Sequence, residues 1–272
     1  MSRTNKILVS SFVLVSLGTF TSITYASHSW GNYHWARTVN PFALKLGDNV
    51  SSVWDAHLAA ASSDWSVSPM FDTNIVPGLT DPRRCRATNG RVEVCNSKYG
   101  NNGWLGVASI WANGDHITQG TVKLNDTYFN TAKYNTPAWR QFVACQEIGH
   151  TFGLDHQDVN FTNANLGTCM DYTNDPDGTL YGQLDNQHPN QHDYDELGII
   201  YQHLDTFTTA LSSVFNKKSS VSASAGEAGD VDTSNPSEWG KAIQKGKDGR
   251  SVLHERDLGK GQKIFTFVIW AN

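Results

Sequence analysis

The chain has 272 residues, of which 17% are charged and 39% hydrophobic, and its formal net charge is −5. Residues 1–26 hold two of the 21 basic residues and none of the 26 acidic ones, so residues 27–272 carry a net charge of −7. This acidic balance argues against nucleic acid or an anionic membrane surface as the partner.

Residues 1–26 have the pattern of a secretory signal peptide. Arg3 and Lys6 precede an apolar stretch from Ile7 to Phe20, and a small-residue cleavage site ends at Ala26. The apolar stretch is shorter than the roughly 20 residues that span a bilayer, and it contains several serines. We therefore expect export with cleavage after Ala26, to the extracellular space or a periplasm, and no membrane segment afterwards.

All four cysteines lie in the part that would remain after cleavage, which suits two disulfides in an oxidising compartment. An Asn-Gly hairpin turn between Cys85 and Cys95 favours that local pair, and Cys145 and Cys169 would then be joined. Four cysteines allow three pairings, and the other two stay open at this point.

The first half of the exported chain reads as strands and one helix. Alternating apolar and polar residues predict a strand over Phe42–Leu46. A helix follows, capped by Asp48 or Asn49, with an apolar face from Val50 to Ala61. Three more strands are predicted between Gly- and Asn-rich turns: Arg91–Asn96, Trp104–Trp111 and His116–Leu124.

Two helices and a long loop are predicted next. Pro137 suits the first turn of a helix, and Gly153 ends that helix because glycine accepts a left-handed turn. Residues 157–192 form an irregular loop, and a loop of this length is more often functional than idle. Asp193 is expected to cap a last helix.

The end of the chain changes composition. Residues 216–238 are mostly Ser, Ala, Gly, Asp and Lys, which is typical of a flexible linker. Lys263–Trp270 is a strong strand candidate that we expect to pair with Ser251–Glu255 or to dock onto the main sheet, since an exposed edge promotes aggregation. The expected organisation is a signal peptide (1–26), one catalytic-type domain (27–215), a linker (216–238) and a β-rich tail (239–272).

One motif carries the chemistry. The run from Cys145 to His156 reads CQEIGHTFGLDH, which matches H-E-x-x-H-x-x-G-x-x-H except that Gln146 replaces the first histidine. Gln146 and His150 share a helix face, Glu147 lies beside them, and the turn after the helix returns His156. Three convergent groups with a fourth position left for water are typical of a catalytic zinc site, in which Glu147 would accept the proton of the water.

The stretch from Glu147 to His156 resembles the metzincin zinc peptidases and is close to the matrixin version. Met170, 14 residues after His156, is similar to their Met-turn, and residues 192–199 look like the Asp-capped closing helix of matrixins. The resemblance covers about residues 40–206. It implies an α+β fold with a twisted, mostly parallel sheet, an active-site helix and a closing helix.

The resemblance also implies roles for single residues. His150 and His156 would bind zinc, Glu147 would be the general base, and Met170 would form the floor of the site. Tyr172 matches a tyrosine that astacins and serralysins use to stabilise an oxyanion; the alternative is a packed turn aromatic. The implied protein is a secreted, monomeric endopeptidase acting on proteins or peptides. No cysteine precedes the first strand, so matrixin-style latency is not expected.

Gln146 leaves three outcomes open. Its amide oxygen is as many bonds from Cα as the histidine Nε2 that the family uses, but a neutral amide is a weaker zinc ligand than imidazole. Gln146 is thus a weak third ligand, or His188 or His192 completes the site, or the metal is lost and the fold serves as a secreted binding module.

Calcium is a second candidate ion, although the acidic loop fits no EF-hand spacing. The carboxylates of this loop are Asp158, Asp171, Asp175, Asp177 and Asp185.

Overall fold

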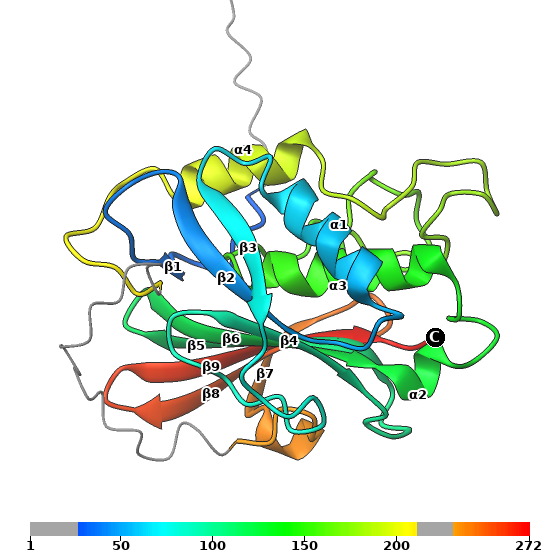
Figure 1. Ribbon diagram of the computed structural model, residues 1–272. Coiled ribbons are helices and arrows are strands. Elements are labelled where there is room, and N and C mark those ends of the chain that lie inside the picture. Colours follow the sequence, from blue (N-terminus) through cyan, green and yellow to red (C-terminus); the bar gives the residue numbers. More distant parts are fainter. Residues whose placement is uncertain (1–26, 211–230) are drawn as a thin grey trace, which may run out of the picture.

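A computed structural model describes residues 27–210 and 231–272. They form an α+β fold in which α1, α3 and α4 lie on one face of a mixed sheet (Figure 1). The elements are β1 (His34–Trp35), β2 (Phe42–Asn49), α1 (Asp55–Trp65), β3 (Phe71–Pro77), β4 (Val92–Ser97), β5 (Trp104–Asn113), β6 (His116–Asn125), α2 (Asp126–Phe129), α3 (Pro137–His150), α4 (Gln191–Ile200), a 3-10 turn (Pro236–Glu238), β7 (Lys241–Lys245), β8 (Ser251–Gly259) and β9 (Gln262–Trp270).

The sheet is half parallel and half antiparallel. Its order is β3-β2-β4-β6-β5-β9-β8-β7, with β1 beside β6. The pairs among β1, β2, β3, β4 and β6 are parallel, whereas β5 pairs antiparallel with both β6 and β9, and β7 to β9 continue antiparallel. The expected mostly parallel sheet therefore describes only its amino-terminal half, because the end of the chain extends the same sheet.

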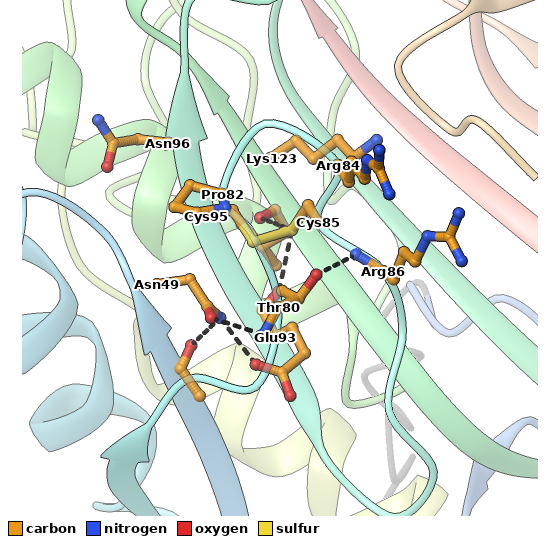
Figure 2. Close-up of a disulfide and its surroundings, with 12 residues drawn as sticks. Asn49, Thr80, Pro82, Arg84, Cys85, Arg86, Glu93, Cys95, Asn96 and Lys123 are labelled. Atoms are coloured by element: carbon orange, nitrogen blue, oxygen red, sulfur yellow. Dashed lines mark hydrogen bonds between the residues drawn. A yellow bond between two sulfur atoms is a disulfide. The ribbon is translucent and has the colours of Figure 1, made fainter. Parts of the chain in front are cut away.

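The core lies between α1, α3 and the sheet. Trp65 of α1 is fully buried, and its indole N–H donates to the Cys145 carbonyl of α3 at 3.1 Å. The two disulfides join the pairs favoured above, Cys85–Cys95 and Cys145–Cys169. Figure 2 shows the first of them beside the buried Glu93. The second ties the end of α3 to the loop that follows it.

Two helices begin where local capping signals did not predict. The first starts at Asp55, because β2 runs on to Asn49 and pairs there with Cys95 of β4. Asp48 instead accepts a hydrogen bond from the Val50 N–H within a turn. The closing helix α4 is capped by Asn190, and the Asp193 carboxylate reaches back to the Asn190 N–H as the third residue of a capping box.

The prediction of a signal peptide falls on residues outside the described part of the chain, as does most of the predicted linker. Residues 231–238 of that linker are described and contain the 3-10 turn. No helix in the two described segments is long and apolar enough to cross a membrane.

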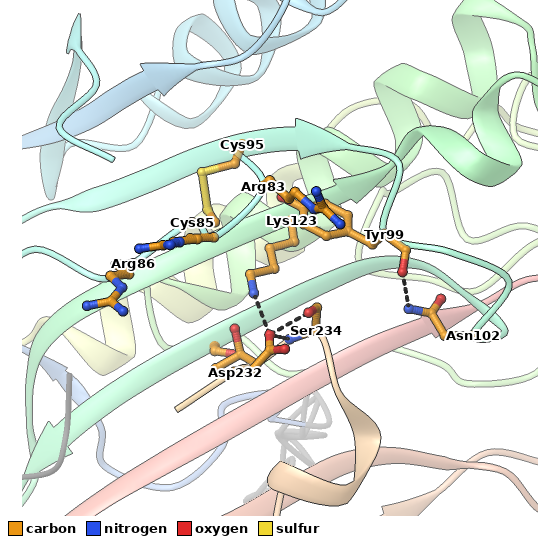
Figure 3. A network of polar contacts seen from close by, with 12 residues as sticks. Arg83, Cys85, Arg86, Cys95, Tyr99, Asn102, Lys123, Asp232 and Ser234 are labelled. Atoms are coloured by element: carbon orange, nitrogen blue, oxygen red, sulfur yellow. Dashed lines mark hydrogen bonds and ion pairs between the residues drawn. A yellow bond between two sulfur atoms is a disulfide. The ribbon is translucent and has the colours of Figure 1, made fainter. Parts of the chain in front are cut away.

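A buried lysine contacts the start of the second described segment. Lys123 of β6 points at Asp232, with 3.6 Å between Nζ and Oδ1 (Figure 3), and its side chain is 1% exposed. Burial lowers the pKa of Lys123 to about 8, although Asp232 acts in the opposite direction. The fold therefore holds an ammonium that is costly to bury.

This lysine makes stability depend on pH. Between pH 8 and the unfolded pKa of 10.5 the folded chain binds fewer protons than the unfolded chain, so the free energy of unfolding should rise with pH in that window. Lys123→Met should be more stable at pH 7, by about 1–3 kcal/mol, and should lack this rise. Urea unfolding at pH 7 to 10 measures both effects, and Lys98→Met, at an exposed lysine, is the control. If the free energy of unfolding changed with pH in the same way in wild type and in Lys123→Met, Lys123 would not be the cause of the rise.

Candidate metal centre

The motif side chains converge at the end of α3. Gln146, Glu147 and His150 are fully buried, and 3.1 Å separates the Nε2 atoms of His150 and His156. Gly153 allows the turn after α3 that brings His156 next to His150. Its φ is +105°, and a Cβ there would lie 2.6 Å from a backbone carbonyl oxygen.

The two imidazoles meet at their Nε2 atoms. Nδ1 of His150 lies 2.8 Å from the Leu154 carbonyl oxygen and must carry the proton, which leaves Nε2 as an acceptor in the neutral ring. Burial, followed by the neighbouring His156, lowers the pKa of His150 well below its usual value. Nδ1 of His156 lies 3.3 Å from the Asp155 carboxylate but forms no hydrogen bond of good geometry among the described residues, so this contact does not fix the tautomer of His156.

If His156 carries its proton on Nε2, the contact between the two Nε2 atoms is a hydrogen bond to Nε2 of His150; if it carries the proton on Nδ1, two lone pairs face each other at 3.1 Å and a cation between them would satisfy both. Two nitrogen ligands of a tetrahedral zinc, each about 2.0–2.1 Å from the ion, are about 3.3–3.4 Å apart. Nδ1–H donation to a carbonyl or carboxylate is also the usual support of a metal-binding histidine. The donor set therefore fits a zinc ion.

Gln146 has the acceptor that a third ligand needs. Its Nε2 donates to the Cys169 carbonyl at 2.7 Å, and the Cys145–Cys169 disulfide holds that carbonyl close to the helix. Its Oε1 is buried and has no hydrogen-bond partner among the described residues. A buried acceptor without a partner is costly, and a metal ion would satisfy it.

The structure places the two alternative ligands elsewhere. His188 is half-exposed, and its Nδ1 lies 2.6 Å from Asp64. His192 stacks on His28 at a centroid distance of 4.8 Å and groups with Asp193. Both histidines therefore contact side chains outside the motif.

Glu147 lies against the backbone of β5 and β9. A Cβ on Gly106 of β5 would come within 2.7 Å of its Oε1, so the close approach needs glycine. Burial raises the pKa of Glu147 well above its usual value, and the backbone N–H groups of Ala108 and Ile269 act in the opposite direction. Neither carboxylate oxygen forms a hydrogen bond of good geometry among the described residues.

Met170 and Tyr172 complete the surroundings. The sulfur of Met170 would lie 2.7 Å from a Cβ on Gly149, so it packs directly against α3. The Tyr172 ring meets His156 edge-on at 4.6 Å, and its hydroxyl donates to the Val268 carbonyl. Burial, followed by the Glu147 charge, raises the pKa of Tyr172, so the hydroxyl stays a donor at neutral pH.

Strand β9 covers these groups. The Phe267 ring stacks on His150 with 4.1 Å between centroids and 10° between planes. Val268 and Ile269 follow, with the carbonyl of Val268 on Tyr172 and the N–H of Ile269 toward Glu147. The Val268–Ile269 peptide bond thus spans the two polar groups beside the imidazole pair. A strand over residues 263–270 was expected, but no local signal placed it on the motif.

Comparison with known proteins adds little to this geometry. No model of a protein family matches the chain, and no curated protein matches it in sequence. Among solved structures, the chain is similar to high choriolytic enzyme 1, a hatching enzyme zinc-protease from the medaka fish Oryzias latipes. The two share 10% sequence identity at a TM-score of 0.36, over 62% of this chain and 94% of the other.

The acidic loop residues that suggested calcium are engaged by neighbouring backbone. Asp171 accepts from the Leu166 N–H, and Asp175 from two N–H groups five and six residues later. Asp158, Asp177 and Asp185 each accept from an N–H two residues further along the chain. These contacts explain Asp158, Asp177 and Asp185 as turn residues, whereas the buried Oδ1 of Asp171 has no hydrogen-bond partner among the described residues.

Proposed function

We propose that the chain is a secreted zinc-dependent endopeptidase of the metzincin kind, described here in a closed form. The observation that carries the proposal is the position of β9: the Val268 carbonyl accepts a hydrogen bond from the Tyr172 hydroxyl, the Ile269 N–H is directed toward Glu147, and the preceding Phe267 ring stacks on His150. The carbonyl of the Val268–Ile269 peptide bond thus faces the hydroxyl donor, and its amide nitrogen faces the carboxylate.

The residues suit peptide hydrolysis. His150, His156 and Gln146 would hold the zinc ion, which when bound lowers the pKa of a water ligand to about 7 and polarises a carbonyl. Glu147 would accept the proton of the attacking water and return it to the leaving nitrogen, and a raised pKa suits a group with both tasks. Tyr172 would donate to the oxygen that becomes negative in the tetrahedral intermediate.

Strand β9 occupies the edge that a substrate would use. Extended peptides bind by adding a strand to a sheet edge, and β5 is the strand directly above Glu147. Its partner there is β9, with Ala108 opposite Phe267 and Val107 opposite Val268. We therefore propose that cleavage requires β9 to leave β5 over these residues.

Displacing β9 is costly. Six consecutive residues of the strand are buried, from Ile264 to Ile269. Burial of one large apolar side chain contributes about 1.5–3 kcal/mol, so releasing several of them costs as much as a sizeable part of the stability of a domain. Hydrolysis by the full chain should therefore be slow unless something stabilises the open form.

A second candidate function is a binding module without catalysis, which the complete burial of Glu147 and His150 favours. Zinc analysis of purified residues 27–272 and incubation with casein separate the two. Bound zinc with cleavage supports the peptidase. No zinc at micromolar free metal, together with no cleavage, would reject it.

Substitutions at Gln146 test its place in the site. Gln146→His should raise zinc affinity by about tenfold or more, because imidazole is the better zinc donor. Gln146→Leu removes the amide oxygen and should lower zinc affinity. Competition with a chromophoric chelator measures both; if neither variant shifts the affinity, the third ligand is another group.

A further inference from the structure

A second group of metal-binding side chains gathers away from the motif. His34 comes from β1, His116 from the start of β6 and Asp205 from the segment after α4, and His203 of the same segment lies beside Asp205. Asp205 is the centre of the group: its carboxylate oxygens lie 3.5 Å from Nε2 of His34, 3.2 Å from that of His116 and 3.7 Å from that of His203.

His34 has a buried nitrogen that needs a partner. Its side chain is 4% exposed, and its Nδ1 lies 2.7 Å from the Asn32 carbonyl oxygen, so Nδ1 carries the proton. Nε2 of the neutral ring is then a lone pair directed at the Asp205 carboxylate, and it has no hydrogen-bond partner in the described part of the chain. A lone pair facing a carboxylate is repulsive, and either a second proton on the ring or a metal ion between the two atoms would remove the repulsion.

The spacing fits a tetrahedral ion better than a set of hydrogen bonds. Ligand atoms around zinc lie about 3.3–3.4 Å apart, and the three distances to Asp205 scatter around that value. Two of the three are at or beyond the outer limit of a good hydrogen bond. The ligand atoms of His34, His116 and Asp205 all lie within 4.8 Å of one another.

Arg37 shares one oxygen of this carboxylate with His34. It engages Oδ2 of Asp205, which lies 3.5 Å from Nε2 of His34, through its backbone N–H at 3.1 Å and its guanidinium at 3.4 Å, and the guanidinium also donates to the Tyr201 carbonyl. Oδ1 is the oxygen that faces His116 and His203. A cavity of about 410 Å³, lined by all three histidines, gives an ion access to the group.

We propose that His34, His116, His203 and Asp205 form a second metal site, for a divalent first-row transition ion with zinc as the first candidate. Three imidazoles and one carboxylate are borderline donors that suit zinc, whereas magnesium and calcium take oxygen ligands. The ion would join β1, β6 and the segment after α4 at one point. This site does not depend on the proposed peptidase activity.

Zinc equivalents per chain test the site. Wild-type protein, loaded with zinc and freed of excess by gel filtration, should hold one equivalent more than His116→Gln/His203→Gln. Both side chains are partly exposed, at 28% and 53%, so the double variant should fold. His188→Gln is the matched control, because His188 is equally exposed and also lies beside a single carboxylate.

The outcomes are distinct. His203→Gln alone should weaken the second binding step by about tenfold or more, and zinc should raise the melting temperature of the His188→Gln control more than that of the double variant. Equal zinc content in wild type, control and double variant would overturn the proposal. The proposal would also be overturned if the second zinc-binding step had the same affinity in His203→Gln as in the His188→Gln control.

Discussion

Replacement of Glu147 by Gln should lower peptide hydrolysis by about 10²–10⁴-fold while zinc stays bound, because a general base contributes a factor of this size. The amide keeps the shape of the carboxylate in a site where Gly106 leaves no spare room, so the fold should be preserved. Initial rates on a quenched fluorescent peptide, together with zinc analysis of the same sample, measure both quantities.

The control for this variant is Glu196→Gln. Glu196 is also a buried carboxylate, but it lies on α4 and accepts a hydrogen bond from Ser27. Its amide variant should cleave at the wild-type rate. If Glu147→Gln retained the rate of this control, Glu147 would not be the base, and the chemistry would need another proton acceptor.

Locking β9 onto β5 should abolish cleavage. Ser109 and Thr266 are directly opposite each other in the two strands, and 3.4 Å separates their side-chain oxygens. In Ser109→Cys/Thr266→Cys a cross-strand disulfide would hold β9 in place. Because a substrate needs the same edge of β5, we expect the oxidised protein to cleave at least about 100-fold more slowly than wild type.

The matched control is Ser109→Ala/Thr266→Ala, which loses the same hydroxyls but cannot form the bridge. Hydrogen exchange of the β9 amides reports on locking independently of activity. It should be slower in the bridged protein than in the alanine control. Cleavage by the bridged protein at the rate of the control would mean that substrates reach Glu147 by another route.

Much of the candidate site could be predicted from short spacings in the sequence. Gln146, Glu147 and His150 lie within five residues on one helix, so helical periodicity alone brings them together. His156 needed only the left-handed turn at Gly153. The structure brings His150 and His156 within 3.1 Å of each other, and Tyr172 lies beside His156.

The position of β9 could not be predicted in the same way, because β5 and β9 are separated by well over a hundred residues. The run from Trp104 to Trp111 is almost continuously apolar, which is typical of a strand that is buried on both faces. This pattern does not indicate which strand pairs with the second edge of β5.

The second metal site illustrates the same limit. Its proposed ligands come from positions 34, 116, 203 and 205, and only the last two are close in sequence. The late start of α1 has a related cause: a cap residue at Asp48 or Asn49 is a local preference, and pairing of β2 with β4 overrides it. In both cases contacts between segments far apart in sequence decide the structure, and local sequence preferences do not report such contacts.

Anomalous diffraction at the zinc edge, from crystals of zinc-loaded residues 27–272, tests the central claim most directly. We expect a peak about 2.0–2.1 Å from Nε2 of both His150 and His156, with the Oε1 of Gln146 as a neighbour and β9 in place above it. The claim would be contradicted by well-ordered His150 and His156 rings that hydrogen-bond to each other with no anomalous peak between them.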